Sequence, residues 1–253
     1  MISVPDPQCG FVVHDLCLDA AVTLAGTGCA AEVDVARTAD GVAVVLPCAA
    51  HLGKEIALRT VSDATASSLD PCLFPPVETV LARLAALELP AVLDLKAGPG
   101  DEARTAAALL ARVPQPGNHR VISFNHRVVR LLSERWGASA CGVLFAGLPV
   151  DVHAVAAAAD AGWVVMQSRF LESALCAELR VGGIRTMTFS ATTPERFVEA
   201  VASGADSVMA ELEIVSANTS TTYPRGGAVE PGDPAEPPIA GTGAGRPGGP
   251  AGR

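Results

Sequence analysis

Short β-branched, apolar runs alternate with Ala- and Leu-rich segments of helical spacing along most of this 253-residue chain. The predicted strands are 11–14, 31–35, 42–46, 90–96, 120–124, 140–145, 163–167, 184–190 and 206–210. The predicted helices are 18–27, 76–88, 101–112, 126–136, 150–161, 171–180 and 193–203. Continuous apolar strands separated by helices indicate a parallel sheet that is covered on both faces. Eight or nine strands in this length fit a closed α/β TIM (β/α)8 barrel better than an open sheet.

The composition changes near Asn218. Residues 222–253 contain 7 Pro and 9 Gly and almost nothing that can pack in a core. Such a segment cannot offset the entropy lost on ordering. We therefore predict one folded domain over residues 8–217 and a disordered tail over residues 218–253. The short strand 42–46 follows the turn signal Asp40-Gly41 and is predicted to be a local addition to the barrel.

Net charge, hydropathy and cysteine content limit the kinds of binding partner and the cellular location that the sequence allows. The net charge of -9 argues against nucleic acid or an anionic membrane as a partner. The first residues lack a basic segment, and no stretch approaches the ~20 apolar residues of a membrane span. The seven cysteines are odd in number, irregularly spaced and without a CxxC pair, so reduced thiols are expected. These features predict a cytoplasmic protein without a membrane span, and no particular oligomeric state.

Charged residues interrupt the apolar strands near their carboxyl ends, where TIM barrels carry their active sites. Glu32 and Asp34 share one face of their strand, as do Asp94 and Lys96, and His14 ends the first strand. Three converging carboxylates would repel one another unless a divalent cation joined them. Oxygen ligands alone favour Mg2+ or Ca2+. The alternative is that Lys96 merely neutralises Asp94 while Glu32 faces solvent.

Five stretches of the sequence, in this order, resemble the glycerophosphodiester phosphodiesterase family. They read AAEVDVARTADGVAVVL, FPPVETVLARL, AVLDLK, VISFNHRVVRLL and GIRTMTFSATTPERFVEAVASGADSVMA. The match in order and spacing extends over about residues 10–212. The resemblance implies a TIM barrel and the metal-dependent hydrolysis of a glycerol-type phosphodiester, an activity of lipid metabolism. The expected partner is thus a small anionic phosphodiester.

The resemblance also implies roles for individual residues. His14 falls on the first catalytic histidine of the family, and Glu32 and Asp34 fall on two metal ligands. Asp94 takes the third ligand position, where glutamate is usual, and Lys96 matches the lysine that supports the phosphate. Mg2+ or Ca2+ would polarise the phosphoryl oxygens. His14 would transfer the proton of an attacking hydroxyl group or water.

The chain departs from the family pattern at several of its motifs. Asp15 stands where the family has arginine, and Pro47-Cys48 replaces a His-Asp pair, which removes the second acid/base histidine. Met187 and Ser190 replace a late-strand tryptophan and asparagine. Since one positioned acid or base contributes about 10²–10⁴-fold to a rate, an unaided enzyme of the family type would be strongly impaired.

Other residues offer substitutes for the missing groups. Arg169 is predicted to bind substrate in place of the lost arginine, or else to be a solvated residue at a helix entry. Met187 and Phe189 are predicted to line an apolar substrate pocket, or else to fill the barrel. His51 is either a loop imidazole that reaches the site or an exposed loop residue.

Three functions are compatible with this sequence. The first is a divergent, metal-dependent phosphodiesterase. The second is a catalytically impaired relative that binds a phosphorylated metabolite or a protein. The third is an enzyme of altered chemistry, such as cyclisation or elimination, which requires only one proton-transfer group.

Overall fold

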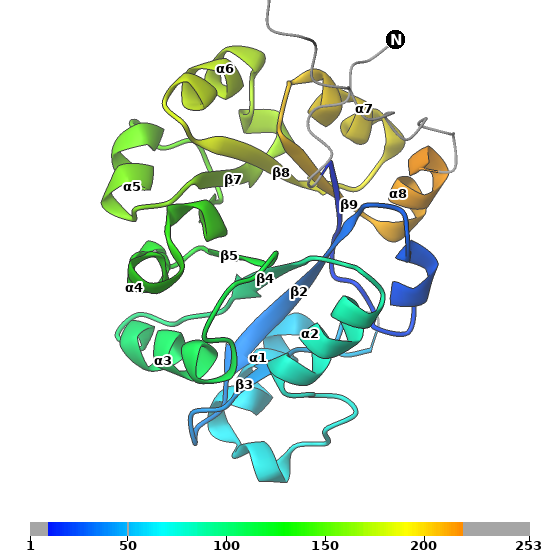
Figure 1. Ribbon diagram of the computed structural model, residues 1–253, viewed down its shortest axis with the longest axis vertical. Helices are drawn as coiled ribbons and strands as arrows, with labels where there is room; N and C mark the ends of the chain where they lie inside the picture. Colours follow the sequence, from blue (N-terminus) through cyan, green and yellow to red (C-terminus); the bar gives the residue numbers. More distant parts are fainter. Residues whose placement is uncertain (1–9, 50, 220–253) are drawn as a thin grey trace, which may run out of the picture. The chain divides into compact units, whose positions relative to one another are not determined.

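The computed structural model describes residues 10–49 and 51–219, and it confirms the TIM barrel (Figure 1). Eight parallel strands pair side by side, and β1 pairs with both β9 and β2, so the sheet closes on itself. These strands are β1 (Phe11–Val13), β2 (Ala30–Arg37), β4 (Ala91–Leu95), β5 (Arg120–Ser123), β6 (Cys141–Phe145), β7 (Trp163–Gln167), β8 (Arg185–Ala191) and β9 (Ser207–Ala210). Each begins and ends within two residues of its predicted bounds.

A ninth strand, β3 (Ala43–Val45), lies outside the parallel barrel. It pairs antiparallel with the end of β2, with Val35 opposite Val45 and Arg37 opposite Ala43. The connecting turn contains Gly41 at φ 86°, a backbone conformation that glycine adopts without strain. The predicted local addition is thus an extension of β2 beyond the barrel wall.

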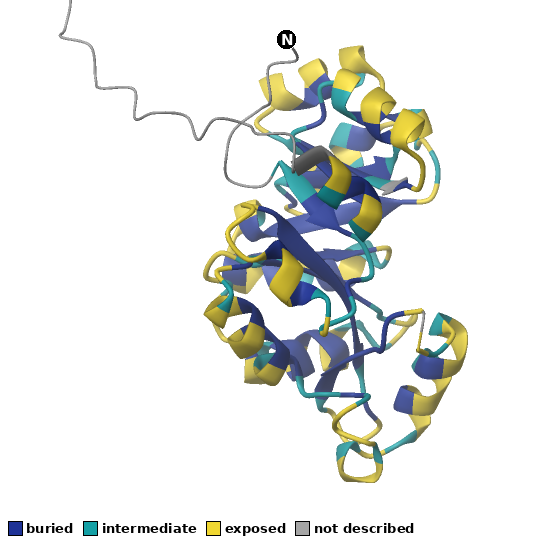
Figure 2. Ribbon diagram, turned by 90° about the vertical axis from the view of Figure 1, so that its right-hand side faces the viewer, coloured by how far each residue is buried: buried dark blue, intermediate teal, exposed yellow. Residues whose placement is uncertain are grey.

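Helices surround the barrel and expose their outer faces (Figures 1 and 2). They are α2 (Val77–Ala86), α3 (Glu102–Arg112), α4 (His126–Trp136), α5 (Val152–Ala158), α6 (Ser173–Val181), α7 (Pro194–Ala202) and α8 (Leu212–Thr219). The start of α7 shows why the sequence folds this way. Thr193 accepts a hydrogen bond from the Arg196 amide, and Pro194 occupies the first turn, where its missing N–H costs nothing.

One predicted helix is absent, and one helix was not predicted. Residues 18–27 form no α-helix but only the short 3-10 turn η1 (Ala21–Leu24), and the chain then passes through Gly26 and Gly28 at positive φ. A helix that was not predicted, α1 (Lys54–Asp63), follows β3. Its charged and polar residues gave a weak apolar pattern, and it buries only Ala57 and Val61.

The core has two layers because successive strand residues face opposite sides. Val12 points into the barrel, whereas Val13 packs against the surrounding helices. In this aromatic-poor chain, the large side chain of Trp163 lies in the barrel interior and is 2% exposed. Gly142 makes room for it, since a Cβ there would lie 2.9 Å from the Trp163 Cβ atom. The barrel is therefore packed shut below its mouth.

The carboxyl end of the described chain is α8, which extends to Thr219, two residues beyond the predicted end of the domain. The rest of the predicted tail, residues 220–253, lies outside the described residues. Among the described helices, none has both the length and the apolar character that a membrane crossing requires.

Candidate active site

Three acidic side chains meet at the mouth of the barrel, at the carboxyl ends of β2 and β4. Asp34 and Asp94 are register partners on these neighbouring strands, and Glu32 precedes Asp34 on the same face. Carboxylate oxygens of the three residues lie within 4.8 Å of one another. We call Glu32, Asp34 and Asp94 the carboxylate cluster. All three are buried, with Glu32 only 2% exposed, so Glu32 does not face bulk solvent.

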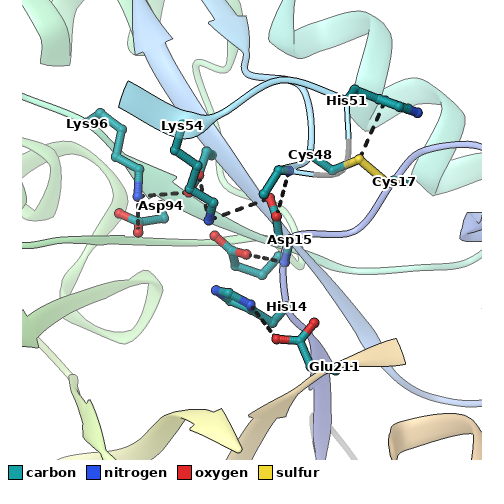
Figure 3. A network of polar contacts seen from close by, with 12 residues as sticks. His14, Asp15, Cys17, Cys48, His51, Lys54, Asp94, Lys96 and Glu211 are labelled. Carbon is teal, nitrogen blue, oxygen red and sulfur yellow. Dashed lines mark hydrogen bonds and ion pairs between the residues drawn. A yellow bond between two sulfur atoms is a disulfide. The ribbon is translucent and has the colours of Figure 1, made fainter. Parts of the chain in front are cut away.

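Two lysines form ion pairs with members of the carboxylate cluster (Figure 3). Lys96 Nζ lies 2.8 Å from Asp34 Oδ1 and also contacts Asp94 Oδ2. Lys54, the first residue of α1, places its Nζ 2.9 Å from Asp34 Oδ2 and 3.5 Å from Asp15 Oδ1. The sequence reasoning missed Lys54. A signal was available, since the chain has only two lysines among its 18 basic residues.

Burial and charge act against each other in this cluster. Burial, together with the neighbouring charges of Asp34 and Asp94, raises the pKa of Glu32 well above its usual range. Burial also works to raise the pKa of Asp34, but Lys96 and Lys54 outweigh it and lower that pKa. For Asp94, burial dominates and the pKa rises. The two lysines therefore stabilise the ionised form of Asp34, whereas burial outweighs their effect at Glu32 and Asp94.

The residues of this site fit a divalent cation. With Asp15 included, the ionised site holds two more carboxylates than ammonium groups. Asp94 Oδ1 is buried and has no hydrogen-bond partner among the described residues. The donors are all oxygen atoms, which Mg2+ and Ca2+ prefer. Such an ion would have to share Asp34 with the two lysines. The predicted neutralisation of Asp94 by Lys96 is also present, but it leaves Glu32 unbalanced.

His14 completes the site from the end of β1. Its Nδ1 atom lies 3.3 Å from Glu211 Oε1, and its backbone N–H donates to the Ala210 carbonyl at 2.9 Å. Figure 3 shows His14 below the carboxylates, with Glu211 beyond it. Glu211 directly follows β9 and was also missed, although the rule that barrel sites lie at strand ends points to it. The carboxylate fixes the orientation of the imidazole ring.

Asp15 has a structural part in the loop after β1. It adopts φ 50°, a left-handed conformation that aspartate tolerates better than most residues. In this conformation its N–H donates to Glu32 Oε2 at 2.7 Å, and its Oδ2 accepts from the Ala49 N–H at 2.8 Å. Asp15 therefore ties the carboxylate cluster to the loop after β3.

A disulfide joins the same two loops and overturns the prediction of reduced thiols. Cys17 and Cys48 are bonded, with their Cα atoms 5.3 Å apart. The described free cysteines are Cys29, Cys141 and Cys176, which are buried, and Cys72, which is exposed. The pairing was hidden because its partners are 31 residues apart and meet only when β1 and β3 end at the same face. Stable disulfides persist in oxidising compartments, so this bond gives no support to the predicted cytoplasmic location.

The Pro47-Cys48 pair is thus an anchor and not an acid/base group. His51, considered as a substitute for the missing histidine, is exposed, and its Nδ1 lies 3.5 Å from Cys48 Sγ. In this position it contacts the disulfide.

A cavity of about 160 Å³ opens over the carboxylate cluster. Its polar lining is His14, Glu32, Lys54, Asp94 and Lys96, and its apolar lining is Ile122, Phe124, Leu144, Phe189 and Met209. Phe189 therefore lies where a substrate residue was predicted. Met187 is fully buried in the barrel interior and is not part of this lining. Arg169 is not part of it either, since its guanidinium lies over the Phe170 ring at 4.7 Å.

Comparisons with known proteins identify the fold. No protein-family model and no curated protein matches this sequence. Among solved structures, the chain is similar to an Oleispira antarctica phosphodiesterase in complex with the product sn-glycerol-3-phosphate. The TM-score is 0.66 at 15% identity, over 85% of this chain and 98% of that chain.

Two further solved structures are similar to this chain. A glycerophosphodiester phosphodiesterase from Parabacteroides distasonis gives a TM-score of 0.65 at 18% identity, over 84% of this chain and 95% of that one. The enzyme from Thermotoga maritima gives 0.57 at 17% identity, over 80% and 90%. The fold implied by the sequence resemblance is confirmed: this chain has the TIM-barrel fold of the glycerophosphodiester phosphodiesterases.

Proposed function

We propose that this protein is a metal-dependent phosphodiesterase that hydrolyses a glycerophosphodiester-like substrate at the mouth of the barrel. The observation that carries the proposal is that His14, Lys96 and two members of the carboxylate cluster, Glu32 and Asp94, line one cavity, with the third member, Asp34, within 4.8 Å of both. The fold shared with glycerophosphodiester phosphodiesterases supports it. The fold alone would not suffice, because TIM barrels serve many unrelated reactions.

Each residue of the site has a task that follows from its position. Glu32, Asp34 and Asp94 would hold Mg2+ or Ca2+, which polarises a phosphoryl oxygen when bound. Lys96, a cation held between two carboxylates, balances the negative charge that develops on the phosphate. His14 moves a proton between the attacking hydroxyl group or water and the bulk, in an orientation set by Glu211.

The apolar half of the cavity would receive the part of the substrate that carries no charge. Phe124 and Phe189 form an edge-to-face pair there, with ring centroids 6.1 Å apart. A phosphodiester bound with its phosphate against the lysines would direct one of its alcohol groups toward these rings. Phe189 therefore remains our proposed substrate-binding residue, whereas Met187 supports the barrel from within.

The direct test is the release of alcohol from a panel of glycerophosphodiesters, with Mg2+, with Ca2+ and with a chelator. We expect turnover that requires a divalent ion and that is lost in Glu32→Ala. Glu55→Ala is the matched control because Glu55 is an exposed glutamate on α1. No turnover on the panel, or turnover that Glu32→Ala leaves intact, would contradict the proposal.

Product analysis separates this proposal from altered chemistry. Hydrolysis in H2¹⁸O places one ¹⁸O atom in the phosphate product, whereas cyclisation or elimination incorporates none. Mass spectrometry of the products distinguishes the two. A protein that binds divalent ions but converts no substrate would instead be a binding relative. Ion binding itself is measured by the rise in melting temperature, because a ligand of the native state stabilises it.

A further inference from the structure

The two lysines of this chain occupy one place in the structure. Of its 18 basic residues, 16 are arginines, and both lysines, Lys54 and Lys96, contact Asp34. Everywhere else the chain uses the planar guanidinium group. Lysine offers a compact point charge with three N–H donors, which a planar fork cannot replace at a crowded site. Because both lysines of the chain lie at this one site, we infer that the site requires ammonium groups for its function.

The contacts of Lys54 leave it able to bind a further anion. Its two ion pairs, with Asp34 and Asp15, use two of the three N–H donors. The side chain is 35% exposed and lines the cavity over the carboxylate cluster. Lys96 likewise has two acidic partners and lines the same cavity. Asp34 contacts both ammonium groups, and each lysine has one more N–H donor than it has acidic partners.

Asp15 holds the ammonium group of Lys54 in place. The family pattern places an arginine at residue 15, and this chain has aspartate there. Asp15 uses its carboxylate to hold Lys54 and the Ala49 N–H of the next loop. A cation therefore stands at the first residue of α1, where the negative charge of Asp15 holds it.

We propose that Lys54 is a phosphate-binding residue of this site, positioned by Asp15, and that it replaces the cation missing at residue 15. This inference deepens the proposed function, on which it rests for the choice of ligand. The guest is a phosphate group, either free or as part of an ester. Lys54 and Lys96 bind it together from one side of the cavity.

The first test uses the rarity of lysine. Protein labelled with ¹³C at lysine Cε gives two signals, one for each lysine, and the Lys54→Arg variant assigns them. Inorganic phosphate and sn-glycerol 3-phosphate are titrated in the presence of Mg2+ at constant pH. We expect the Lys54 signal to shift saturably with both ligands. A Lys54 signal that does not move while phosphate binds would overturn the inference.

The second test measures affinity. Lys54→Met keeps the length of the side chain and removes its charge, and we expect the dissociation constant for phosphate to rise at least about tenfold in calorimetry. Arg59→Met is the matched control because it removes one charge from an exposed position of the same helix, and it should leave the affinity unchanged. Equal affinities of Lys54→Met and the wild type would refute the role of Lys54.

The two tests also separate this inference from the proposed function. Binding of phosphate through Lys54 without turnover of any diester would leave the inference standing and reject the phosphodiesterase. Turnover with a kcat/KM that Lys54→Met does not change would support the phosphodiesterase and reject the inference.

Discussion

The disulfide Cys17–Cys48 should contribute substantially to the stability of the barrel. The perturbation is its removal, either by a reducing agent or in the double variant Cys17→Ala/Cys48→Ala. The bonded residues are 31 positions apart. In the chain-entropy model, the loss of a cross-link over this separation lowers the free energy of unfolding by about 4 kcal/mol. In a domain of this size, 1 kcal/mol shifts the melting temperature by about 2–4 °C. We therefore expect a decrease of roughly 8–15 °C.

The assay is thermal unfolding followed by circular dichroism, with and without a phosphine reductant. The double variant provides the control, since the reductant should change its melting temperature little. The free cysteines of the described chain have no cross-link to lose. The expected pattern is thus a large effect of reductant on the wild type and almost none on the variant. Equal melting temperatures of the oxidised wild type, the reduced wild type and the variant would refute the reasoning.

Three further changes test other parts of the structure. Gly162→Ala would place a Cβ 2.7 Å from the Ala138 carbonyl oxygen. We expect the free energy of unfolding, measured with urea, to fall by about 1–3 kcal/mol, and an unchanged value would contradict this packing. Burial lowers the pKa of His119, so the unfolded chain takes up a proton at a higher pH than the folded chain does. The free energy of unfolding should therefore fall as the pH drops through 6.5. In His119→Gln, the melting temperature should lose this part of its pH dependence. Glu211→Gln weakens the support of the His14 imidazole. In the proposed reaction, kcat/KM should then fall about tenfold with folding intact, whereas full activity would show that Glu211 has no such role.

The barrel could be predicted because its signals are local. Each strand is a short apolar run, and the period of two along β2 and β4 is enough to assign the acidic residues of each strand to one face. The pairing of neighbouring strands then brings Asp34 next to Asp94. The carboxylate cluster was thus accessible from the sequence, since the strands that carry it are regular and their carboxyl ends share one face of the barrel.

Apart from Glu211 at the end of β9, the groups that the sequence reasoning missed come from loops and helix ends. Lys54 reaches the cluster only because the chain turns back after β3 and begins α1 at the barrel mouth. Cys17 meets Cys48 for the same reason. No periodicity connects such positions, and their proximity depends on the path of the loops. For Met187 the sequence left two alternatives, pocket lining or barrel filling, and the structure places its side chain inside the closed barrel.

The loop between β3 and α1 carries one of the departures from the pattern that the sequence resemblance implies. A His-Asp pair is expected there, and the chain instead has an anchor, Cys48, followed six residues later by Lys54. The anchor fixes the loop to the segment after His14, and Asp15 binds both the loop backbone and the lysine. The histidine of this loop, His51, contacts the disulfide and is not among the residues that line the cavity, whereas Lys54, at the start of α1, does line it. His14 is the histidine of the cavity lining, and Lys54 adds a second ammonium group to that lining beside Lys96. In the proposed reaction, proton transfer would depend on His14, while charge stabilisation would be divided between Lys54 and Lys96.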